Sequence, residues 1–440
     1  MKEKIRIGCG AGFSGDRLDP ALTLVENGKL DYLVLECLAE RTIALAQKRK
    51  LQNPLLGYDP LLERRIELLI EPLKRKQVRL ITNMGAANPL AALDKVLEIA
   101  KQKNLAITVA AVTGDDVLAQ INPNDPCLET GKPLTTVGPL VSANAYLGSE
   151  GIQEALQSDA GIIITGRVAD PSLFLAPMMH EFKWHSDDYA MLGRGTVLGH
   201  LMECAGQVTG GYYADPGKKD VPDMANLGHP ILEVASNGEG VVTKVTGTGG
   251  LINLDTVKEQ LLYEVVNPYE YFTPDVIADF SLVKLQASGK DEVRVTGGDG
   301  KRRPETFKVS VGYQAGFIGE GEIAYAGYNA VRRARLAGDI VKERLKGVFH
   351  ELRVDLIGMN SVHGNEFHKN NEPYEVRLRI AGKAATAAHA ARVGEEVEAL
   401  YTNGPAGGGG VRKYVHETIG IVSTLLPREK VKPHVILKST

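Results

Sequence analysis

Residues 193–216 gather reactive side chains among glycines that ordinary core helices avoid. The spacing of residues 197–205 predicts a helix, which places His200, Glu203 and Cys204 within one turn of each other, because side chains three and four residues apart meet on a helix. The glycines that follow end this helix and let the backbone approach a ligand closely. The segment therefore has the pattern of a functional site.

Each polar residue of this segment has a catalytic and a structural interpretation. We expect Glu203 to transfer protons while Gln207 and Thr209 hold a carbonyl oxygen; the alternative is a polar helix at a domain or subunit interface. Cys204 is a candidate nucleophile if its thiol pKa is depressed, and otherwise a buried inert thiol. His200 with Glu203 has the spacing of metal ligands, but the sequence contains no matching second set, so we predict no metal site.

A glycine loop with Gly10, Gly12 and Gly15 follows the first expected strand. Formally it fits the dinucleotide-binding fingerprint, with Glu36 where a ribose-binding acid would stand. However, residues 19–20 (Asp-Pro) form an N-cap and first-turn signal, so the helix begins after the third glycine, which the fingerprint places inside the first turn. We therefore expect no nicotinamide or flavin cofactor, and glycines that support an acyl or acidic ligand.

Charged residues also end this loop and the next expected strand. Asp16 and Arg17 point into one cleft, either as a structural ion pair or as a pair that orients a ligand. Glu36 ends the second strand, where it is either a general acid or base or part of a helix cap. These residues extend the candidate site to the N-terminal part of the chain.

Two later loops carry further candidates. Asn83 is placed to bind a carbonyl or carboxylate, and Arg167 has the planar fork that suits a carboxylate or phosphate. We expect Arg167 to anchor an anion, with a structural pairing to Asp170 as the alternative. Near the C-terminus, Gly408 and Gly409 precede two cations and would cradle the phosphates of coenzyme A, or form an interface or lid loop.

Several motifs together resemble one known family over nearly the whole chain. They are GHLMECAGQVTGG, LDYLVLECLAERT, ITNMGAANP, ITGRVADPSLFLAP and YNAVRRARLAGDIVKERL, and they are similar to the acyclic terpene utilisation protein A (AtuA-like) family. The resemblance implies a bacterial cytoplasmic protein that takes part in catabolism of branched acids and terpenoids such as citronellol and geraniol, at the acyl-thioester stage. It also favours a functional role for Glu36, which lies in a recurring motif of the family.

The composition favours a protein that acts on a small molecule. A net charge of −3 and a pI near 6.4 argue against nucleic-acid binding, and no apolar run has the length of a signal peptide or a membrane span. The four cysteines, Cys9, Cys37, Cys127 and Cys204, form no CxxC pair, so we expect free thiols. We expect a cytoplasmic homo-oligomer that acts on a small molecule without nucleic-acid or membrane partners.

The elements that position these residues are read from the hydrophobic pattern. Short apolar runs such as YLVL and GIIITG alternate with helical stretches in the first half, which predicts an α/β fold with a mainly parallel sheet. Alternating strands with a hairpin at residues 297–300 follow. We therefore expect an α/β domain over 1–235 and a smaller α+β domain with antiparallel strands over 236–440. Ligands of open parallel sheets bind at the carboxyl ends of the strands, where the candidate residues lie.

Two functions from different classes fit these observations. The first is a lyase-type enzyme that moves protons, or adds or eliminates water, on a branched acyl thioester or carboxylic acid, with Glu203 and Glu36 exchanging protons. In it, Arg167 anchors a carboxylate, while Asn83 and Gln207 polarise a carbonyl. The second is a non-catalytic subunit that binds an acyl ligand or forms a complex with a partner enzyme. Turnover of a candidate substrate by the pure protein separates the two.

Overall fold

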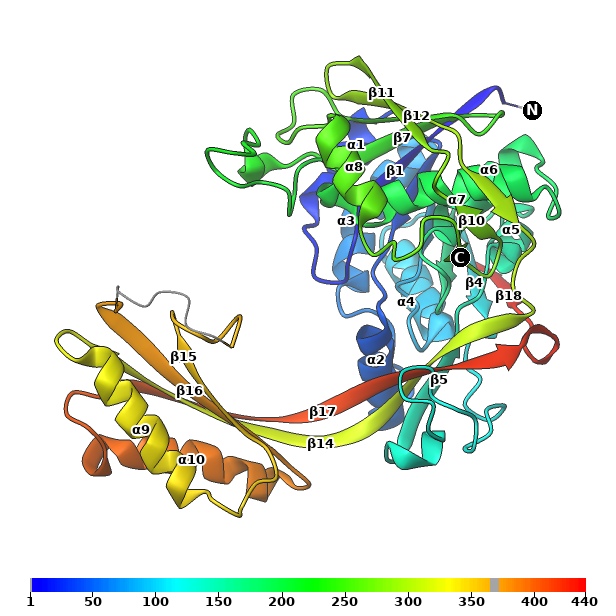
Figure 1. The fold of residues 1–440 in the computed structure, drawn as a ribbon. Helices are drawn as coiled ribbons and strands as arrows, with labels where there is room; N and C mark the ends of the chain where they lie inside the picture. Colours follow the sequence, from blue (N-terminus) through cyan, green and yellow to red (C-terminus); the bar gives the residue numbers. More distant parts are fainter. Residues whose placement is uncertain (1, 365–371) are drawn as a thin grey trace. The chain divides into compact units, whose positions relative to one another are not determined.

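The computed structural model describes residues 2–364 and 372–440, and the chain forms two compact units (Figure 1). Unit 1 comprises Met1–Thr136, Leu140–Gly312 and Ile421–Thr440, and unit 2 comprises Val137–Pro139 and Tyr313–Gly420. These units differ from the expected division after residue 235, because the chain enters unit 2 along β14 (Thr306–Ala326) and leaves it along β17 (Gly409–Pro427).

Unit 1 contains a ten-stranded mixed sheet with a parallel centre. The strands β1, β2, β3, β6 and β4 are neighbours in this order and all run parallel. Antiparallel strands extend the sheet at both ends. In sheet order the strands are β11 (Lys284–Gly289), β12 (Glu292–Thr296), β8 (Gly240–Lys244), β7 (Pro230–Ala235), β1 (Lys4–Ala11), β2 (Tyr32–Leu35), β3 (Arg79–Thr82), β6 (Ile162–Thr165), β4 (Thr108–Thr113) and β18 (His434–Ser439). This confirms the expected α/β fold.

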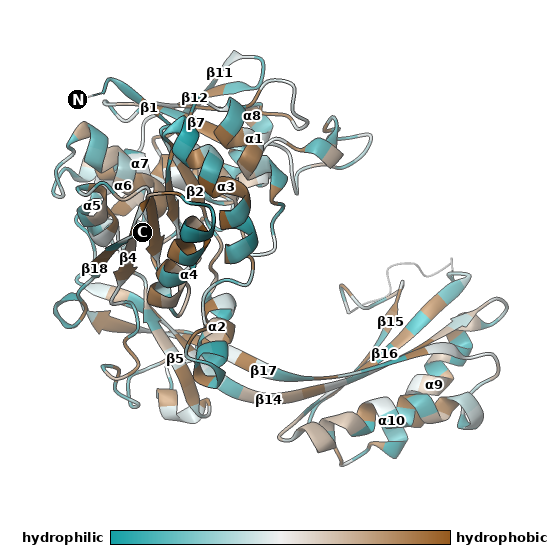
Figure 2. Ribbon diagram, turned by 180° about the vertical axis from the view of Figure 1, so that it is seen from behind, coloured by the Kyte–Doolittle hydropathy of each residue, from teal (hydrophilic) through white to brown (hydrophobic). Residues whose placement is uncertain are grey.

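The central strands are short apolar runs because both of their faces are covered. Every residue of β2 and of β6 is buried, and these central strands are brown in the hydropathy view (Figure 2). One face packs against α1, α3 and α4, and the other against α5, α6 and α7. Helix bounds in unit 1 are α1 (Asp19–Asn27), α2 (Glu40–Gln52), α3 (Leu62–Lys76), α4 (Pro89–Gln102), α5 (Glu150–Leu156), α6 (Ser172–Phe182), α7 (Tyr189–Glu203) and α8 (Leu254–Leu262).

The hairpin expected at residues 297–300 is wrong. β12 pairs with β11 and β8 in the large sheet, whereas β13 (Asp299–Lys301) pairs with β10 (Ile277–Asp279) in a separate sheet of three strands with β9 (Tyr271–Phe272). Gly297 and Gly298 have φ values of 80° and 83°, a conformation that favours glycine. The glycines therefore redirect the chain from one sheet to another.

Unit 2 is a βαββαβ unit. Its elements are β14, α9 (Ala330–Arg344), β15 (Leu352–Ile357), β16 (Glu375–Ala384), α10 (Ala387–Asn403) and β17. The sheet order is β15-β16-β14-β17, with β16 antiparallel to both of its neighbours, which is the ferredoxin-like arrangement. Side chains of α9, α10 and the three strands β14, β15 and β16 form its own apolar core. The first residues of β14, Thr306–Gly312, belong to unit 1, as does β5 (Leu140–Ala145), which pairs with β14.

Candidate active site

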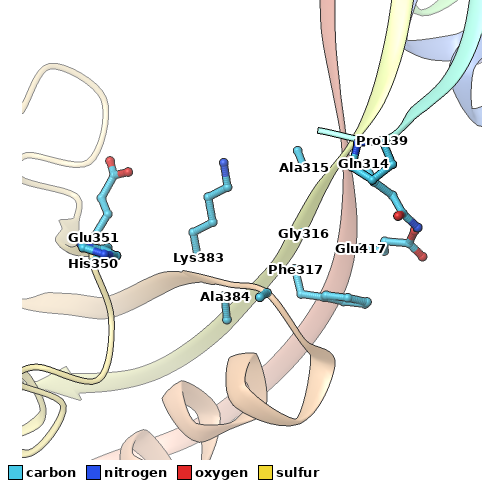
Figure 3. Close-up of a pocket in the computed structure, with 11 residues that line it drawn as sticks. Pro139, Gln314, Ala315, Gly316, Phe317, His350, Glu351, Lys383, Ala384 and Glu417 are labelled. Carbon is cyan, nitrogen blue, oxygen red and sulfur yellow. The ribbon is translucent and has the colours of Figure 1, made fainter. Parts of the chain in front are cut away.

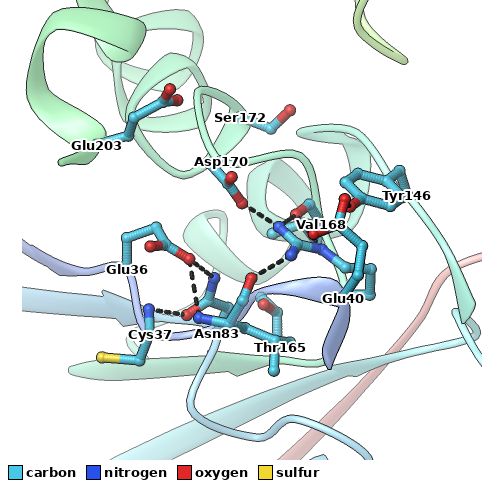
Figure 4. A network of polar contacts seen from close by, with 12 residues as sticks. Glu36, Cys37, Glu40, Asn83, Tyr146, Thr165, Val168, Asp170, Ser172 and Glu203 are labelled. Carbon is cyan, nitrogen blue, oxygen red and sulfur yellow. Dashed lines mark hydrogen bonds and ion pairs between the residues drawn. The ribbon is translucent and has the colours of Figure 1, made fainter. Parts of the chain in front are cut away.

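Three predicted site residues meet at one edge of the unit 1 sheet. Glu36 follows β2, Asn83 follows β3 and Arg167 lies two residues beyond β6. Because these three strands are adjacent and parallel, their carboxyl ends deliver the following loops to the same edge. Figure 4 shows this edge together with Asp170 and Glu203.

Asn83 holds Glu36 in place. The Asn83 amide donates from Nδ2 to Glu36 Oε1 at 2.8 Å, and its Oδ1 accepts from the Cys37 backbone N–H at 2.7 Å. The Leu38 N–H also donates to Glu36 Oε1, at 2.9 Å. Burial raises the pKa of Glu36 well above its ordinary value, and the nearby negative charge of Asp170 adds to this effect. Glu36 is therefore a carboxyl group that retains a proton at a higher pH than usual.

Arg167 is buried, and its side chain contacts other parts of the protein. The guanidinium forms an ion pair with Asp170 and donates to the backbone carbonyls of Leu38 and Val168. It also lies over the Tyr146 ring, 4.5 Å from the ring centroid. The structural pairing with Asp170 that the sequence left open is thus present, and the role of Arg167 as an anion anchor stays a prediction.

Asp170 is more accessible than Glu36 and Glu203, with a side chain that is 37% exposed. Surrounding protein raises the pKa of Asp170, and the Arg167 charge opposes this shift. The position of Asp170 gives the buried carboxyls of the site a polar neighbour that reaches solvent.

Residues that the sequence analysis missed support this edge. Asp115 Oδ2 accepts from the Arg167 backbone N–H at 3.0 Å and from Asn144 Nδ2 at 2.9 Å. Burial raises the pKa of Asp115 to about 6. The Tyr146 hydroxyl donates to Glu40. Asp115 follows β4 after one glycine, so the strand-end rule that selected Glu36 would also have found it; the partners of Tyr146 are distant in sequence and left no local signal.

Helix α7 delivers the second half of the site. It begins after Asp188, whose side chain accepts from the Met191 N–H at 3.3 Å, and it ends at Glu203. Its glycines allow close packing: a Cβ at Gly193 would lie 2.0 Å from the Asp299 carbonyl oxygen, and one at Gly199 would lie 2.8 Å from the Pro171 oxygen. The glycines inside this helix thus serve contact with neighbouring backbone.

His200 and Glu203 form a buried pair joined by a hydrogen bond. His200 Nε2 lies 2.9 Å from the Gln260 carbonyl oxygen, which only accepts, so Nε2 carries a hydrogen. His200 Nδ1 lies 2.9 Å from Glu203 Oε1. The proton between these two atoms belongs either to a histidinium that faces a carboxylate or to a carboxylic acid that faces neutral histidine. Gln260 Nε2 donates to the His200 carbonyl at 3.0 Å and fixes the arrangement.

The second oxygen of Glu203 has no partner. Glu203 is 7% exposed, and its Oε2 is buried without a hydrogen bond among the described residues. Burial raises the pKa of Glu203 to about 7, although the His200 charge opposes the shift. Burial lowers the pKa of His200, but Glu203 outweighs this and the net shift is upward. An unpartnered carboxyl oxygen that titrates near neutrality is a feature of proton-transfer sites.

The remaining candidate residues of this segment are Cys204, Gln207 and Thr209. Cys204 is partly exposed, and burial raises the pKa of its thiol above the ordinary value, which opposes thiolate formation. The Thr209 hydroxyl donates to the Gly206 carbonyl at 3.0 Å, and Gln207 ends a short 3-10 helix, Ala205–Gln207. The substrate contacts expected of Gln207 and Thr209 stay predictions.

The first glycine loop packs against the end of α7. A Cβ at Gly12 would lie 2.5 Å from the Cys204 carbonyl carbon. Inside the loop, the Asp16 carboxylate accepts from the N–H groups of Gly12 and Arg17 at 2.9 and 2.8 Å, so it already occupies amides that would face an anionic ligand. The Arg17 guanidinium instead donates to the Ala225 carbonyl at 2.8 Å. Helix α1 begins four residues after the third glycine, at Asp19.

A groove of about 530 Å³ lies in unit 2 (Figure 3). Gln314 and Phe317 line it together with His350, Glu351 and Lys383. These three ionisable side chains are exposed, and none of the predicted site residues lines the groove. We therefore place the candidate active site at the buried carboxyl cluster in unit 1 and not at this groove.

Within residues 2–364 and 372–440, no group of three or more His, Cys, Asp and Glu side chains is arranged to hold a metal ion. Over the same residues, no helix combines the length and apolar character needed to cross a membrane.

The family follows from the sequence as a whole. The sequence model of acyclic terpene utilisation family protein AtuA matches residues 5–437. The chain belongs to this family. The match includes the strand-end loops that carry Glu36, Asn83 and Arg167 as well as the helix that carries His200 and Glu203. No curated protein and no solved structure matches the chain.

Proposed function

We propose that this protein is an enzyme of acyclic terpene utilisation that transfers protons on an acyl substrate, adding or eliminating water in a lyase-type reaction. The observation that carries the proposal is the His200–Glu203 pair. One Glu203 oxygen is fixed by histidine, while the other is buried and unpartnered. Glu36 and Asp170, whose pKa values are also raised, belong to the same cluster of carboxyl groups.

The two buried carboxyl groups suit opposite proton transfers. In hydration, an ionised carboxylate takes a proton from water as the oxygen bonds to the β-carbon, and a protonated carboxyl gives a proton to the α-carbon. In elimination, the same groups act in reverse. Glu203 with a pKa of about 7 populates both states at neutral pH. Glu36 and Glu203 are therefore the acid and base of the proposal.

The neighbouring residues tune these groups. Asn83 donates one hydrogen bond to Glu36 and accepts another from the neighbouring Cys37 backbone N–H, and Gln260 fixes the His200 ring. Arg167 places a buried positive charge near Glu36 and opposes the rise in its pKa. We assign Arg167 mainly to setting the charge of the cluster, since its guanidinium already contacts Asp170 and two carbonyl oxygens.

The substrate we propose is a branched carboxylic acid or its coenzyme A thioester, as in degradation of citronellol and geraniol. Family membership supports this class, and the pI near 6.4 fits a small-molecule partner. We further propose that the protein works in the cytoplasm as a homo-oligomer, without a nicotinamide or flavin. The loop around Gly408 and Gly409 stays a candidate for contacting coenzyme A phosphates.

Turnover by the purified protein tests the proposal. Branched unsaturated acids and their coenzyme A thioesters are incubated in D₂O, and NMR follows deuterium incorporation at the α-carbon and addition of water. We expect wild-type turnover and a loss of at least about 100-fold in Glu203→Gln, because glutamine keeps the size and hydrogen bonding but carries no proton. Glu154→Gln, which changes an exposed residue of α5, is the matched control.

The two functional classes give different results. Saturable binding of these ligands without deuterium exchange or water addition would instead support a non-catalytic acyl-binding subunit. Equal turnover by wild type and a folded Glu203→Gln variant would rule out the assigned acid–base role.

A further inference from the structure

Strand β17 leaves an open edge in unit 2. It is the terminal strand of the sheet order β15-β16-β14-β17, and every residue from 412 to 416 is exposed. Tyr414 and Val415 are large side chains that remain 46% and 42% exposed. The terminal strand of a sheet carries backbone N–H and C=O groups that can pair with another strand. The segment between Gly409 and Gly420 also contains no proline to prevent such pairing.

We propose that this edge pairs with the same edge of a second copy of the chain, so that the two unit 2 sheets become one continuous sheet. A two-fold axis perpendicular to the sheet makes the two β17 strands antiparallel and keeps equivalent faces together. Residues equally distant from the axis then lie opposite each other. The axis must pass through a residue rather than between two, because opposed residues of an antiparallel pair point to the same face.

The side chains favour an axis at Val415. With that register, Lys413 lies opposite Glu417 of the second copy, and each dimer contains this pair twice. Val411 lies opposite Ile419, and Val415 lies opposite its own counterpart. Opposite charges and β-branched side chains directly across antiparallel strands stabilise a sheet. The sequence of the edge is thus complementary to itself.

The neighbouring register is less favourable. With the axis at Tyr414, Arg412 would lie opposite His416 and Val411 opposite Glu417. The first pair brings a cation against a basic ring, and the second places a charge against an apolar side chain. The cross-strand pairs therefore select Val415 as the centre.

Both charged residues are already held beside the strand. Lys413 Nζ lies 2.6 Å from Glu398 Oε2 on α10, and Glu417 Oε1 accepts from Gln314 at 3.3 Å. An ammonium group has three donors and a carboxylate about four acceptor sites. Each group therefore has the capacity for an additional contact with a second copy.

Charge exchange tests the register in the full-length protein. Sedimentation velocity over nanomolar to micromolar concentrations measures the dimer dissociation constant. Lys413→Glu and Glu417→Lys should each weaken the dimer by about tenfold or more, because each creates two like-charge pairs. The double variant should return to within about threefold of wild type, since it restores both pairs with their signs reversed. Lys383→Glu, the same charge change at an exposed residue of β16, should leave the constant unchanged.

A cysteine at the axis provides an independent readout. Val415→Cys should form an intermolecular disulfide under mild oxidation, whereas Leu336→Cys, on the exposed face of α9, should not. A wild-type protein that stays monomeric at all concentrations would overturn the proposal and leave the edge to a different partner. The proposal would also be overturned if neither single charge reversal changed the dimer dissociation constant, or if the double variant dimerised as weakly as the single variants.

Discussion

At the scale of residues, the site depends on carboxyl groups that protein burial keeps from ionising at their ordinary pH. Glu203 is hydrogen-bonded to buried His200, and Glu36 is surrounded by hydrogen-bond donors yet close to Asp170. Each arrangement costs stability, because a buried ionisable group has lost its hydration. Such a cost is common where a group must exchange protons near neutral pH.

From the His200–Glu203 pair we predict that the stability of the fold depends on pH. The pKa of Glu203 is raised from 4.5 to about 7, so between these values the folded protein holds a proton that the unfolded chain releases. The free energy of unfolding should therefore fall as pH rises through this window, by on the order of 1–3 kcal/mol. The raised pKa of His200 acts in the same direction, since its contribution is lost as pH rises.

Melting temperatures of wild type and Glu203→Gln at pH 5 and pH 8 measure this effect. Glutamine resembles the protonated acid, and its amide can accept from His200 Nδ1–H at pH 5 and donate to an unprotonated Nδ1 at pH 8, so the variant should match wild type at pH 5 and exceed it at pH 8. A variant that melts well below wild type at both pH values would show that the carboxyl group has a structural role instead.

Asn83 should contribute to stability as well as to the site. In Asn83→Ala, the Cys37 N–H and Glu36 Oε1 each lose a buried partner. We expect a loss of about 1–3 kcal/mol in the free energy of unfolding, measured by urea denaturation. Asn124→Ala, at an exposed loop residue, serves as the control and should change the urea midpoint far less.

At the scale of elements, the site joins strand ends to the end of a helix that packs unusually closely. Parallel strands place Glu36, Asn83 and Arg167 at one edge, and α7 brings Glu203 to the same cluster. The glycines of α7 allow the approach, because a side chain at Gly193 would overlap the backbone at Asp299. These glycines are present because α7 must lie close to neighbouring backbone, and they do not serve to stabilise the helix itself.

Replacing Gly193 by alanine should therefore destabilise the protein. In an exposed helix the change would add up to about 1 kcal/mol of stability, but here the new Cβ would lie 2.0 Å from the Asp299 oxygen. We expect a lower urea midpoint and lower activity from a displaced α7. Gly161→Ala, whose Cβ would meet only the Ile107 side chain at 3.5 Å, is the control; an equal or higher midpoint for Gly193→Ala would contradict the packing argument.

At the scale of the whole molecule, unit 2 is continuous apart from a short segment, and it has its own core. Tyr313–Gly420 contains all of α9, β15, β16 and α10 and the required parts of β14 and β17. Its apolar cluster draws only on residues of Tyr313–Gly420. A compact unit with a separate core is expected to fold alone.

Expression of Tyr313–Gly420 alone checks this expectation. The fragment should show mixed helix and strand content by circular dichroism and a single cooperative thermal transition. A fragment without a cooperative transition would show that unit 2 needs the rest of the chain in order to fold.

The sequence by itself determined the family, the parallel centre of the sheet and the strand ends at which Glu36, Asn83 and Arg167 lie. Hydrophobic periodicity and strand-end position are local properties, so short segments reveal them. The helix that carries His200 and Glu203 was also visible in this way, although α7 begins earlier than the expected residue 197.

Only the tertiary structure decided which partners these residues have. Gln260 fixes His200 from 60 residues away, and Asp170 pairs with the Arg167 guanidinium, which the sequence had left open as the alternative to an anion anchor. It also decided that residues 297–300 link two sheets instead of closing a hairpin. Such contacts depend on how distant segments pack, because the burial that shifts a pKa and the acceptor that fixes a tautomer are supplied by other elements of the fold.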